Sequence, residues 1–406
     1  MKKFKLFALT ALFAMCGMNA FAAAVLDEDG RSVNGVNYEL WTDGTNKYAL
    51  VQSVNNASTE AQQNTISIPA EVTGEAGTYK VQGFNASWYA AIGAKDVTAV
   101  TTSLSIDVTN FTAALANIDG LTKLESLTIT DNGSDSKNKA LNLSSASFKT
   151  TLKTLDISGS KIEEIKDNGL KDFAALTAID LGQIKTIGKN ALDGCKKVKS
   201  LTIPATVESV GDYAFDNMAD LETLVWNAKI NVPAAFASDN KLKSITVASA
   251  EATTIASGAF TSTVVETIDL SGSPQLATIT GAFAASTKLE KCLLAGTDIS
   301  DITSDPALTA CAATLKEITF PAKITALPKF KNFKVLEKID LSGTKVTAID
   351  AKEFQYCEAL TEVSLNAETA SIGANAFDGC TVLATISNLN NEKLATVGAQ
   401  AFKGRS

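Results

Sequence analysis

The segment Ser371–Cys380 reads SIGANAFDGC, and close variants occur as TIGKNALDGC at 186–195 and SVGDYAFDNM at 209–218. An apolar residue opens each of the other copies, and most steps between copies are 22 to 25 residues long: Ile165, Val232, Ile255, Ile279, Ile302, Ile349 and Val397. A period of this size indicates a repeat array rather than separate globular domains.

A second pattern, L-x-x-[ILV]-x-[ILV], precedes each copy, as in LTAIDL at 176–181, LEKIDL at 336–341 and LTEVSL at 360–365. A short strand with this spacing points alternate side chains inward. The following I-G-x-x-A-F segment turns the chain and buries its Phe between neighbouring turns. One repeat cannot cover its own apolar edge, whereas a stack of repeats can. The two patterns together predict a solenoid over about residues 120–406.

The residue types and spacing of the two patterns resemble those of the BspA-like leucine-rich repeats of bacterial surface and secreted proteins. The match rests on these residues: Ile372, Gly373, Ala376, Phe377, Gly379, Cys380, Leu201, Ile203, Pro204, Val207, Gly211, Ala214 and Phe215. We therefore expect an α/β fold, a right-handed leucine-rich-repeat solenoid. Its parallel β-sheet should line the concave face, with short helices or turns on the convex side.

The first 22 residues have the features of a secretory signal peptide. Three lysines at 2–5 precede an apolar run at 6–15, and Ala-Phe-Ala at 20–22 forms a cleavage signal. The mature chain is predicted to begin at Ala23 and to be secreted or held at the outer surface of a Gram-negative bacterium. Cys16 leaves a lipoprotein anchor open as the alternative.

Residues 23–85 are predicted to form a β-rich N-terminal cap, because alternating segments such as 37–42 and 47–54 are separated by Gly, Asn and Asp. Residues 86–406 are predicted to hold about 11–12 repeats, degenerate between 86 and 150. The last letters, AFKGRS, stop in the middle of a repeat. We therefore expect a longer natural protein, a truncated fragment or a last repeat that stacks on another molecule.

Composition narrows the range of functions. Hydrophobic residues make up 45% and charged residues 20% of the chain, which is typical of a folded protein. The formal net charge of −8 becomes −11 without the three signal-peptide lysines, and this acidity argues against nucleic-acid binding. After the signal peptide no run of 18 apolar residues occurs, so no transmembrane helix is expected.

The chain contains no histidine, which excludes His-based nucleophile pairs and zinc sites. It also has no glycine-rich phosphate loop between a strand and a helix. We expect no enzymatic activity, no cofactor and no metal. Five cysteines follow the signal peptide, and we expect them to be small buried hydrophobes: Cys195, Cys292, Cys311, Cys357 and Cys380.

Candidate binding residues are the polar strand positions that alternate with the inward ones: Asp156, Asp180, Thr202, Thr246, Asp269, Thr319, Asp340 and Ser364. Asp156 and Asp180 should lie on neighbouring turns, roughly 5 Å apart. A solvated pair, a cation site and an acid–base pair all stay open for them. Trp41 and Trp88 are candidates for stacking on sugars, whereas Trp226 falls on an inward position.

The predicted function is that of a non-enzymatic exported recognition protein that binds through the concave face. The resemblance implies adhesion to host extracellular-matrix or cell-surface proteins. A surface carbohydrate-binding protein and a structural protein that stacks on itself are the alternatives. Neither nucleic acid nor a membrane-spanning helix is part of the prediction.

Overall fold

The computed structural model describes residues 25–34, 36–43, 45–54, 65–84, 101–111, 118–133, 138–236, 241–260, 264–284, 286–303 and 306–404. The predicted signal peptide, Cys16 and Trp88 lie outside these residues. The chain divides into two compact units. Unit 1 comprises Met1–Val198 and Ser209–Phe215, and unit 2 comprises Lys199–Glu208 and Asp216–Ser406.

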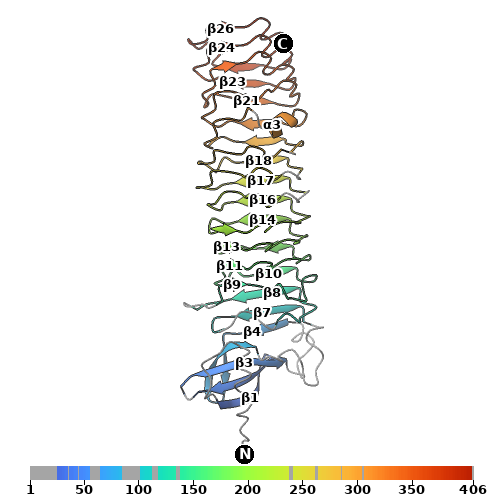
Figure 1. Cartoon of the computed structure of the whole chain (residues 1–406), viewed down its shortest axis with the longest axis vertical. Coiled ribbons are helices and arrows are strands. Elements are labelled where there is room, and N and C mark those ends of the chain that lie inside the picture. Colours follow the sequence, from blue (N-terminus) through green and yellow to red (C-terminus); the bar gives the residue numbers. More distant parts are fainter. Residues whose placement is uncertain are drawn as a thin grey trace, which may run out of the picture. The chain divides into compact units, whose positions relative to one another are not determined.

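Unit 1 begins with a five-stranded sheet, drawn in blue in Figure 1. Its order is β1 (Val25–Val33), β2 (Val36–Thr42), β3 (Lys47–Val54), β6 (Gly77–Phe84), β5 (Glu71–Gly74). All pairs are antiparallel except β3 with β6. Alternation of apolar and polar residues puts Tyr38, Leu40 and Tyr79 on the buried side. Phe84 contacts Phe111 edge to face at 5.7 Å, so this sheet packs on the first turns of the solenoid.

The solenoid turns of unit 1 form two parallel sheets. The first, the five-stranded rung sheet, consists of β4 (Thr65–Ile68), β7 (Ser103–Asp107), β8 (Ser126–Thr130), β10 (Thr154–Asp156) and β12 (Ala178–Ile179). The second consists of β9 (Ala140–Leu141), β11 (Glu164–Ile165), β13 (Thr186–Ile187) and β15 (Ser209–Val210). β4 lies within the range predicted for the cap, yet it pairs with β7. The predicted domain boundaries stay a prediction.

Unit 2 repeats the arrangement. Its nine-stranded rung sheet consists of β14 (Ser200–Ile203), β16 (Thr223–Trp226), β17 (Ser244–Val247), β18 (Thr267–Asp269), β19 (Lys291–Leu293), β20 (Glu317–Thr319), β21 (Lys338–Asp340), β23 (Glu362–Ser364) and β25 (Thr385–Ser387). A three-stranded sheet follows the I-G segments: β22 (Ala348–Ile349), β24 (Ser371–Ile372) and β26 (Thr396–Val397). Among the described residues the one helix is α3 (Pro306–Ala310).

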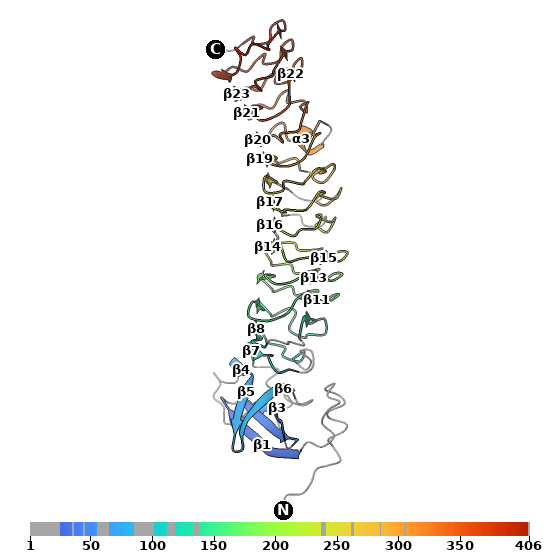
Figure 2. The same cartoon turned by 90° about the vertical axis from the view of Figure 1, so that its left-hand side faces the viewer.

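The predicted fold class is confirmed, because each unit is a stack of turns with parallel strands and almost no helix in its described part. Figures 1 and 2 show the strands of the rung sheets lying one above another within each unit. The middle residue of the strand is buried in each of β10, β18 and β21: Leu155, Ile268 and Ile339. The L-x-x-[ILV]-x-[ILV] pattern therefore supplies the core of every turn.

The glycine of the I-G letters is required by a close approach between turns. Gly373 donates its N–H to the Ile349 carbonyl at 2.7 Å, and a Cβ on Gly373 would lie 2.3 Å from the Ala351 nitrogen. Gly398 has the same relation to Ala374, at 2.4 Å. No real side chain fits at such distances, and Gly188 and Gly211 approach the preceding turn just as closely, at 2.5 Å.

The Asn and the second Gly of the motif occupy left-handed backbone positions. Asn375 has φ 56° and Gly379 has φ 77°, and Asn190 and Gly194 have φ 52° and 78°. Asn and Gly adopt this conformation at lower cost than other residues do. The turn therefore requires a left-handed conformation at both positions, and Asn and Gly are the residues that adopt it most easily.

The phenylalanine of the motif is the predicted plug between turns. Phe330, Phe354, Phe377 and Phe402 stack in sequence at 5.6, 5.3 and 5.5 Å between ring centroids. A second stack consists of Phe236, Phe260 and Phe283. At the next turn α3 replaces the A-F segment, and a void of about 10 Å³ borders Phe283, Ala307 and Leu308. The aromatic stack therefore ends where the repeat changes.

One turn carries a buried carboxylate at a position that is alanine in most other copies of the motif. Glu353 takes the position of Ala376 in the motif, and its side chain is 2% exposed. Lys329 lies 3.0 Å from its carboxylate and 2.8 Å from that of Asp350. Burial raises the pKa of Glu353, and the Lys329 ammonium partly opposes that rise. The ion pair with Lys329 therefore stabilises the Glu353 carboxylate in a position that, in most other turns, holds a buried alanine.

We predict that Gly373→Ala lowers the free energy of unfolding by about 1–3 kcal/mol, because the new methyl group overlaps the backbone of the previous turn. Gly343→Ala is the matched control, since a Cβ there has no atom within 4 Å. Urea unfolding followed by circular dichroism measures both. Equal stability of the two variants would contradict the role assigned to the I-G glycine.

Candidate functional site

The outward residues of the nine-stranded rung sheet form two rows, which we call the sheet face of unit 2. The first row runs Ser200, Thr223, Ser244, Thr267, Lys291, Glu317, Lys338, Glu362 and Thr385. The second contains Thr202, Val225, Thr246, Asp269, Leu293, Thr319, Asp340, Ser364 and Ser387. Each of these side chains is exposed or half-buried.

All eight candidate binding residues point outward from rung strands or follow one directly. Six belong to the sheet face of unit 2, and Asp156 and Asp180 belong to unit 1. β10 and β12 pair through Thr154 with Ala178 and Leu155 with Ile179. Asp156 and Asp180 therefore occupy the next corresponding positions on neighbouring turns. Their binding roles stay a prediction.

The four aspartates have a structural task that the sequence analysis did not identify. Each accepts a backbone hydrogen bond from the residue two positions later, at 2.8–3.0 Å: Asp156 from Ser158, Asp180 from Gly182, Asp269 from Ser271 and Asp340 from Ser342. The serine hydroxyls add a second bond, at 2.7 Å to Asp156. These are Asx turns that end the strand. The recurring D-x-[SG] pattern in the sequence could have indicated these turns.

The threonines and the serine differ in whether their hydroxyls are used internally. Thr319 Oγ1 accepts the backbone N–H groups of Leu294 and Ala295 at 3.0 and 3.1 Å. Within the described part of the chain, no hydrogen bond engages the side chains of Thr202, Thr246 or Ser364. Of the eight candidates, these last three have side chains that make no hydrogen bond with the described residues.

The sheet face of unit 2 changes character along its length. On β14 to β18 six hydroxyls make no hydrogen bond with the described residues, and we call them the hydroxyl patch: Ser200, Thr202, Thr223, Ser244, Thr246 and Thr267. From β19 onward charged side chains pair across strands, with Lys291 2.8 Å from Glu317 and Lys338 2.9 Å from Glu362. Exposed pairs of this kind contribute little stability. They do neutralise one another.

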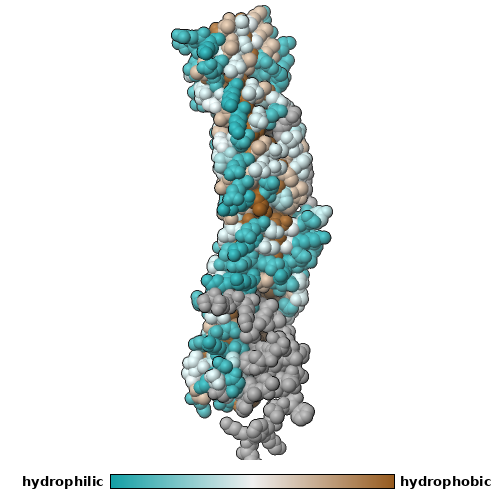
Figure 3. Space-filling model, turned by 60° about the vertical axis from the view of Figure 1, so that its left-hand side comes forward, coloured by the Kyte–Doolittle hydropathy of each residue, from teal (hydrophilic) through white to brown (hydrophobic). Residues whose placement is uncertain are grey.

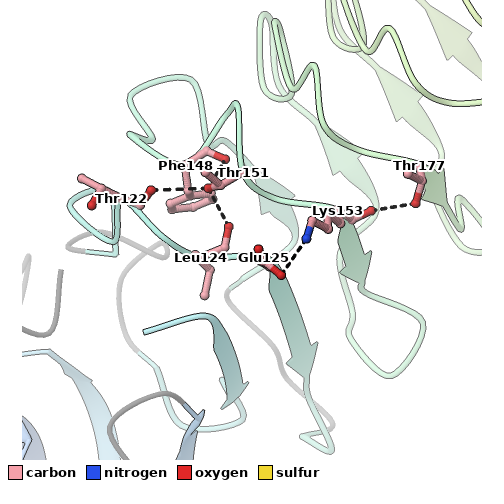
Figure 4. A network of polar contacts seen from close by, with 7 residues as sticks. All are labelled: Thr122, Leu124, Glu125, Phe148, Thr151, Lys153 and Thr177. Carbon is pink, nitrogen blue, oxygen red and sulfur yellow. Dashed lines mark hydrogen bonds and ion pairs between the residues drawn. The ribbon is translucent and has the colours of Figure 1, made fainter. Parts of the chain in front are cut away.

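The strand entrances are joined by a second set of polar contacts, shown for unit 1 in Figure 4. Thr151 Oγ1 donates to the Leu124 carbonyl at 2.8 Å, and Lys153 Nζ lies 2.8 Å from the Glu125 carboxylate. Thr177 Oγ1 then donates to the Lys153 carbonyl at 3.0 Å. These residues connect each turn to the one before it, which makes them part of the scaffold.

A surface hollow of about 170 Å³ lies beside Asp180, lined by Ile157, Ser158, Asp180, Leu181, Gly182 and Gln183. It is smaller than the roughly 300 Å³ of ordinary small-molecule pockets. Gln183 Nε2 donates to the Ile157 carbonyl at 3.2 Å, and the Asp180 carboxylate accepts from its own turn. The chain itself therefore uses the Gln183 amide N–H groups and one carboxylate oxygen of Asp180.

Of the aromatic residues considered as candidates, Trp41 and Trp226 lie within the described part of the chain. Trp41 lies in β2 and is only 8% exposed, which leaves little ring surface for a sugar. Trp226 is fully buried, as predicted, and its Nε1 donates to the Ile230 carbonyl at 3.2 Å. Tyr213 and Tyr356 instead are 59% and 42% exposed, with φ 58° and 63°. Tyr213 takes the Asn position of the motif and Tyr356 the Gly position, which could have shown from the sequence that both lie on an exposed turn.

The five cysteines of the described chain form no disulfide with one another, and all are buried, as expected from the sequence. Cys195, Cys357 and Cys380 donate their S–H groups to carbonyl oxygens of the preceding turn at 3.1–3.3 Å. Burial raises the pKa of Cys195 to about 12 and that of Cys380 to about 11. Such thiols stay protonated and are poor nucleophiles.

The described residues contain no group of three or more His, Cys, Asp or Glu side chains placed to hold a metal ion. They also contain no helix long and apolar enough to cross a membrane. On the side shown in Figure 3, hydrophilic residues dominate and apolar ones are confined to small areas.

The sequence model described as "BspA type Leucine rich repeat region" matches six copies, over residues 122–233, 232–330 and 280–406. A search of curated proteins finds no significant match.

Three solved bacterial proteins are similar to the chain. A leucine-rich cell-surface protein of Faecalibacterium prausnitzii is 19% identical, over 88% of this chain and 94% of that one, with TM-score 0.28. A leucine-rich repeat protein of Bacteroides ovatus is 18% identical over 92% of each chain, with TM-score 0.30. An internalin of Listeria monocytogenes is 16% identical, over 84% and 88%, with TM-score 0.40. Because these TM-scores are low, no residue role is transferred.

We predict that Asp156→Ala destabilises the protein by about 1 kcal/mol at pH 7, since the turn loses its hydrogen-bond acceptor. The hydroxyl and the N–H of Ser158 lower the pKa of Asp156. The stabilisation is therefore present above the ordinary carboxyl pKa of about 3.9 and is lost as the pH falls through the lower folded value.

Urea unfolding of wild type and variant between pH 7 and pH 2 measures this difference. Asp156→Asn is the control, because its amide oxygen still accepts the N–H but does not titrate. A difference between wild type and Asp156→Ala that stays constant with pH would contradict the assignment.

Proposed function

The chain belongs to the BspA-type leucine-rich repeat family, whose repeats match 122–406, and from this premise we propose that it is an exported recognition protein that binds another protein through the sheet face of unit 2. Membership of the family supports a protein-interaction or cell-surface role. The adhesin-like character, with a host extracellular-matrix or cell-surface protein as the partner, is our proposal.

The observation that carries the proposal is the hydroxyl patch. Its six hydroxyls lie side by side on β14 to β18 and are exposed or half-buried. Elsewhere on the described sheet face, Asp269 and Asp340 accept from their own turns, Thr319 accepts from the preceding turn, and lysines pair with glutamates. The patch is therefore the part of the sheet face whose hydrogen-bonding groups are most available to a partner.

Two half-buried apolar side chains, Val225 and Leu293, lie in the second row, within and beside the patch. Protein interfaces combine a core depleted in charge with a polar, charged rim. Val225 and the hydroxyl patch match such a core, and the paired charges from Lys291 to Glu362 match the rim. A protein partner fits this combination better than a small molecule does.

The proposed location is the bacterial cell surface. The chain would reach it by Sec export, with residues 1–22 removed as the signal peptide. A lipid anchor at Cys16 is the alternative route to the same surface. Both proposals rest on the amino-terminal sequence pattern.

We predict saturable binding of the purified full chain to immobilised fibronectin or fibrinogen, measured by biolayer interferometry. The double variant Val225→Arg/Thr246→Arg should weaken binding at least about tenfold, because two bulky cations are placed in a neutral contact. Binding of the wild type should change little with salt, since the six hydroxyls and Val225 at the centre of the contact carry no charge.

The matched control is Ser105→Arg/Thr128→Arg, which makes the same kind of change on the rung sheet of unit 1. Equal loss in both double variants, or no loss in the first, would overturn the proposed location. Absence of saturable binding to both proteins would overturn the proposed partner class.

A further inference from the structure

The outward face of the five-stranded rung sheet in unit 1 is a regular array of hydroxyl groups. Strand register places Thr65, Ser103, Ser126 and Thr154 in one row across β4, β7, β8 and β10. It places Ser67, Ser105 and Thr128 in a second row, which ends at Asp156. We call the seven serines and threonines the hydroxyl lattice.

The hydroxyl lattice has no task within the described chain. None of its seven side chains makes a hydrogen bond to a described residue, and all are exposed or half-buried. The Asp156 carboxylate at the end of the second row already accepts from Ser158. The nearest charges at the strand entrances, Glu125 and Lys153, neutralise one another at 2.8 Å. The seven hydroxyls are therefore uncharged and free of internal hydrogen bonds, and the carboxylates of Asp107 and Asp156 lie on the same outward face.

Its composition selects the chemistry of a ligand. Each hydroxyl can donate one hydrogen bond and accept two, so the lattice is best matched by a ligand that is itself rich in hydroxyls. The two rows contain no aromatic or arginine side chain, the types that dominate the binding energy of protein interfaces, and no apolar one comparable with Val225 in the hydroxyl patch. They also lack any cation that would attract a polyanion.

Its spacing selects the shape of a ligand. Neighbouring strands are about 4.8 Å apart, so hydroxyls recur at that interval along each row, across the strands. A linear glycan chain also presents its hydroxyls at a regular interval of similar size. Laid across the strands, it can match one sugar residue to one turn over the four strands of the lattice.

We propose that the hydroxyl lattice binds a linear, neutral polysaccharide that lies across β4, β7, β8 and β10 with about one sugar per turn. Without an aromatic platform each sugar contributes weakly, and affinity builds up along the chain of the ligand. This site is on a different sheet from the hydroxyl patch and does not depend on the proposed function.

The test uses the full chain and four soluble neutral polysaccharides: hydroxyethylcellulose, arabinoxylan, galactomannan and amylose. Affinity electrophoresis identifies a binder, and calorimetry then follows its oligosaccharides from two to six sugars. The affinity should rise with each added sugar up to about four, the number of strands in the lattice, and then level off. Binding should be insensitive to salt, and polygalacturonate, a polyanion, should not compete.

The lattice variant is Ser103→Ala/Ser105→Ala/Ser126→Ala/Thr128→Val, which removes hydroxyls with little change in shape. It should weaken glycan binding at least about tenfold with an unchanged circular-dichroism spectrum and melting temperature. The matched control is Ser200→Ala/Thr202→Val/Ser244→Ala/Thr246→Val on unit 2, which should bind glycan like the wild type.

Each contrary result overturns the proposal. These results are no binding to any of the four polysaccharides, unchanged binding by the lattice variant, preference for polygalacturonate, and a plateau at one or two sugars. Loss of fibronectin or fibrinogen binding in the unit 2 variant with glycan binding retained would separate the two sites.

Discussion

Backbone hydrogen bonds between successive turns hold each turn one strand spacing from the next, and the other contacts follow from that distance. The Gly373 N–H bonds to the Ile349 carbonyl at 2.7 Å, and the Ala384 N–H bonds to the Thr361 carbonyl at 3.0 Å. At a spacing of about 4.8 Å, equivalent side chains must stack on one another. Phe377 therefore lies on Phe354, and Lys338 pairs with Glu362.

The fold was predictable because these contacts are the same in every turn, so the letters that make them recur. Gly373, Phe377 and Cys380 each meet the previous turn through a contact that their counterparts repeat. Features that occur in only one turn could not be predicted from the repeat pattern. The ion pair of Glu353 with Lys329 joins positions 24 residues apart, and α3 ends the phenylalanine stack without a repeated signal.

The candidate site was predictable only in outline. Strand alternation placed all eight residues on the outward side, but it did not distinguish hydroxyls and carboxylates that bond their own turn from those that are free. Asp269 and Thr319 serve the scaffold, whereas Thr202 and Thr246 do not. An outward side chain does not pack against the same side chain of the neighbouring turn, so its residue type need not recur in each repeat. The role of an outward residue therefore cannot be inferred from the repeat pattern. The rung sheets of the two units consequently share a scaffold and differ in what they expose.

The central claim is that recognition occurs on outward strand positions and not on the turns. Hydroxyl-radical footprinting of the full chain with and without saturating fibronectin or fibrinogen tests it directly, because the exposed reporters lie on both surfaces. Bound fibronectin or fibrinogen should protect Val225 and Leu293 from oxidation. Tyr213 and Tyr356 should stay as reactive as in the chain without partner. Protection of the two tyrosines with unchanged Val225 and Leu293 would contradict the central claim and would move the binding surface to the turns.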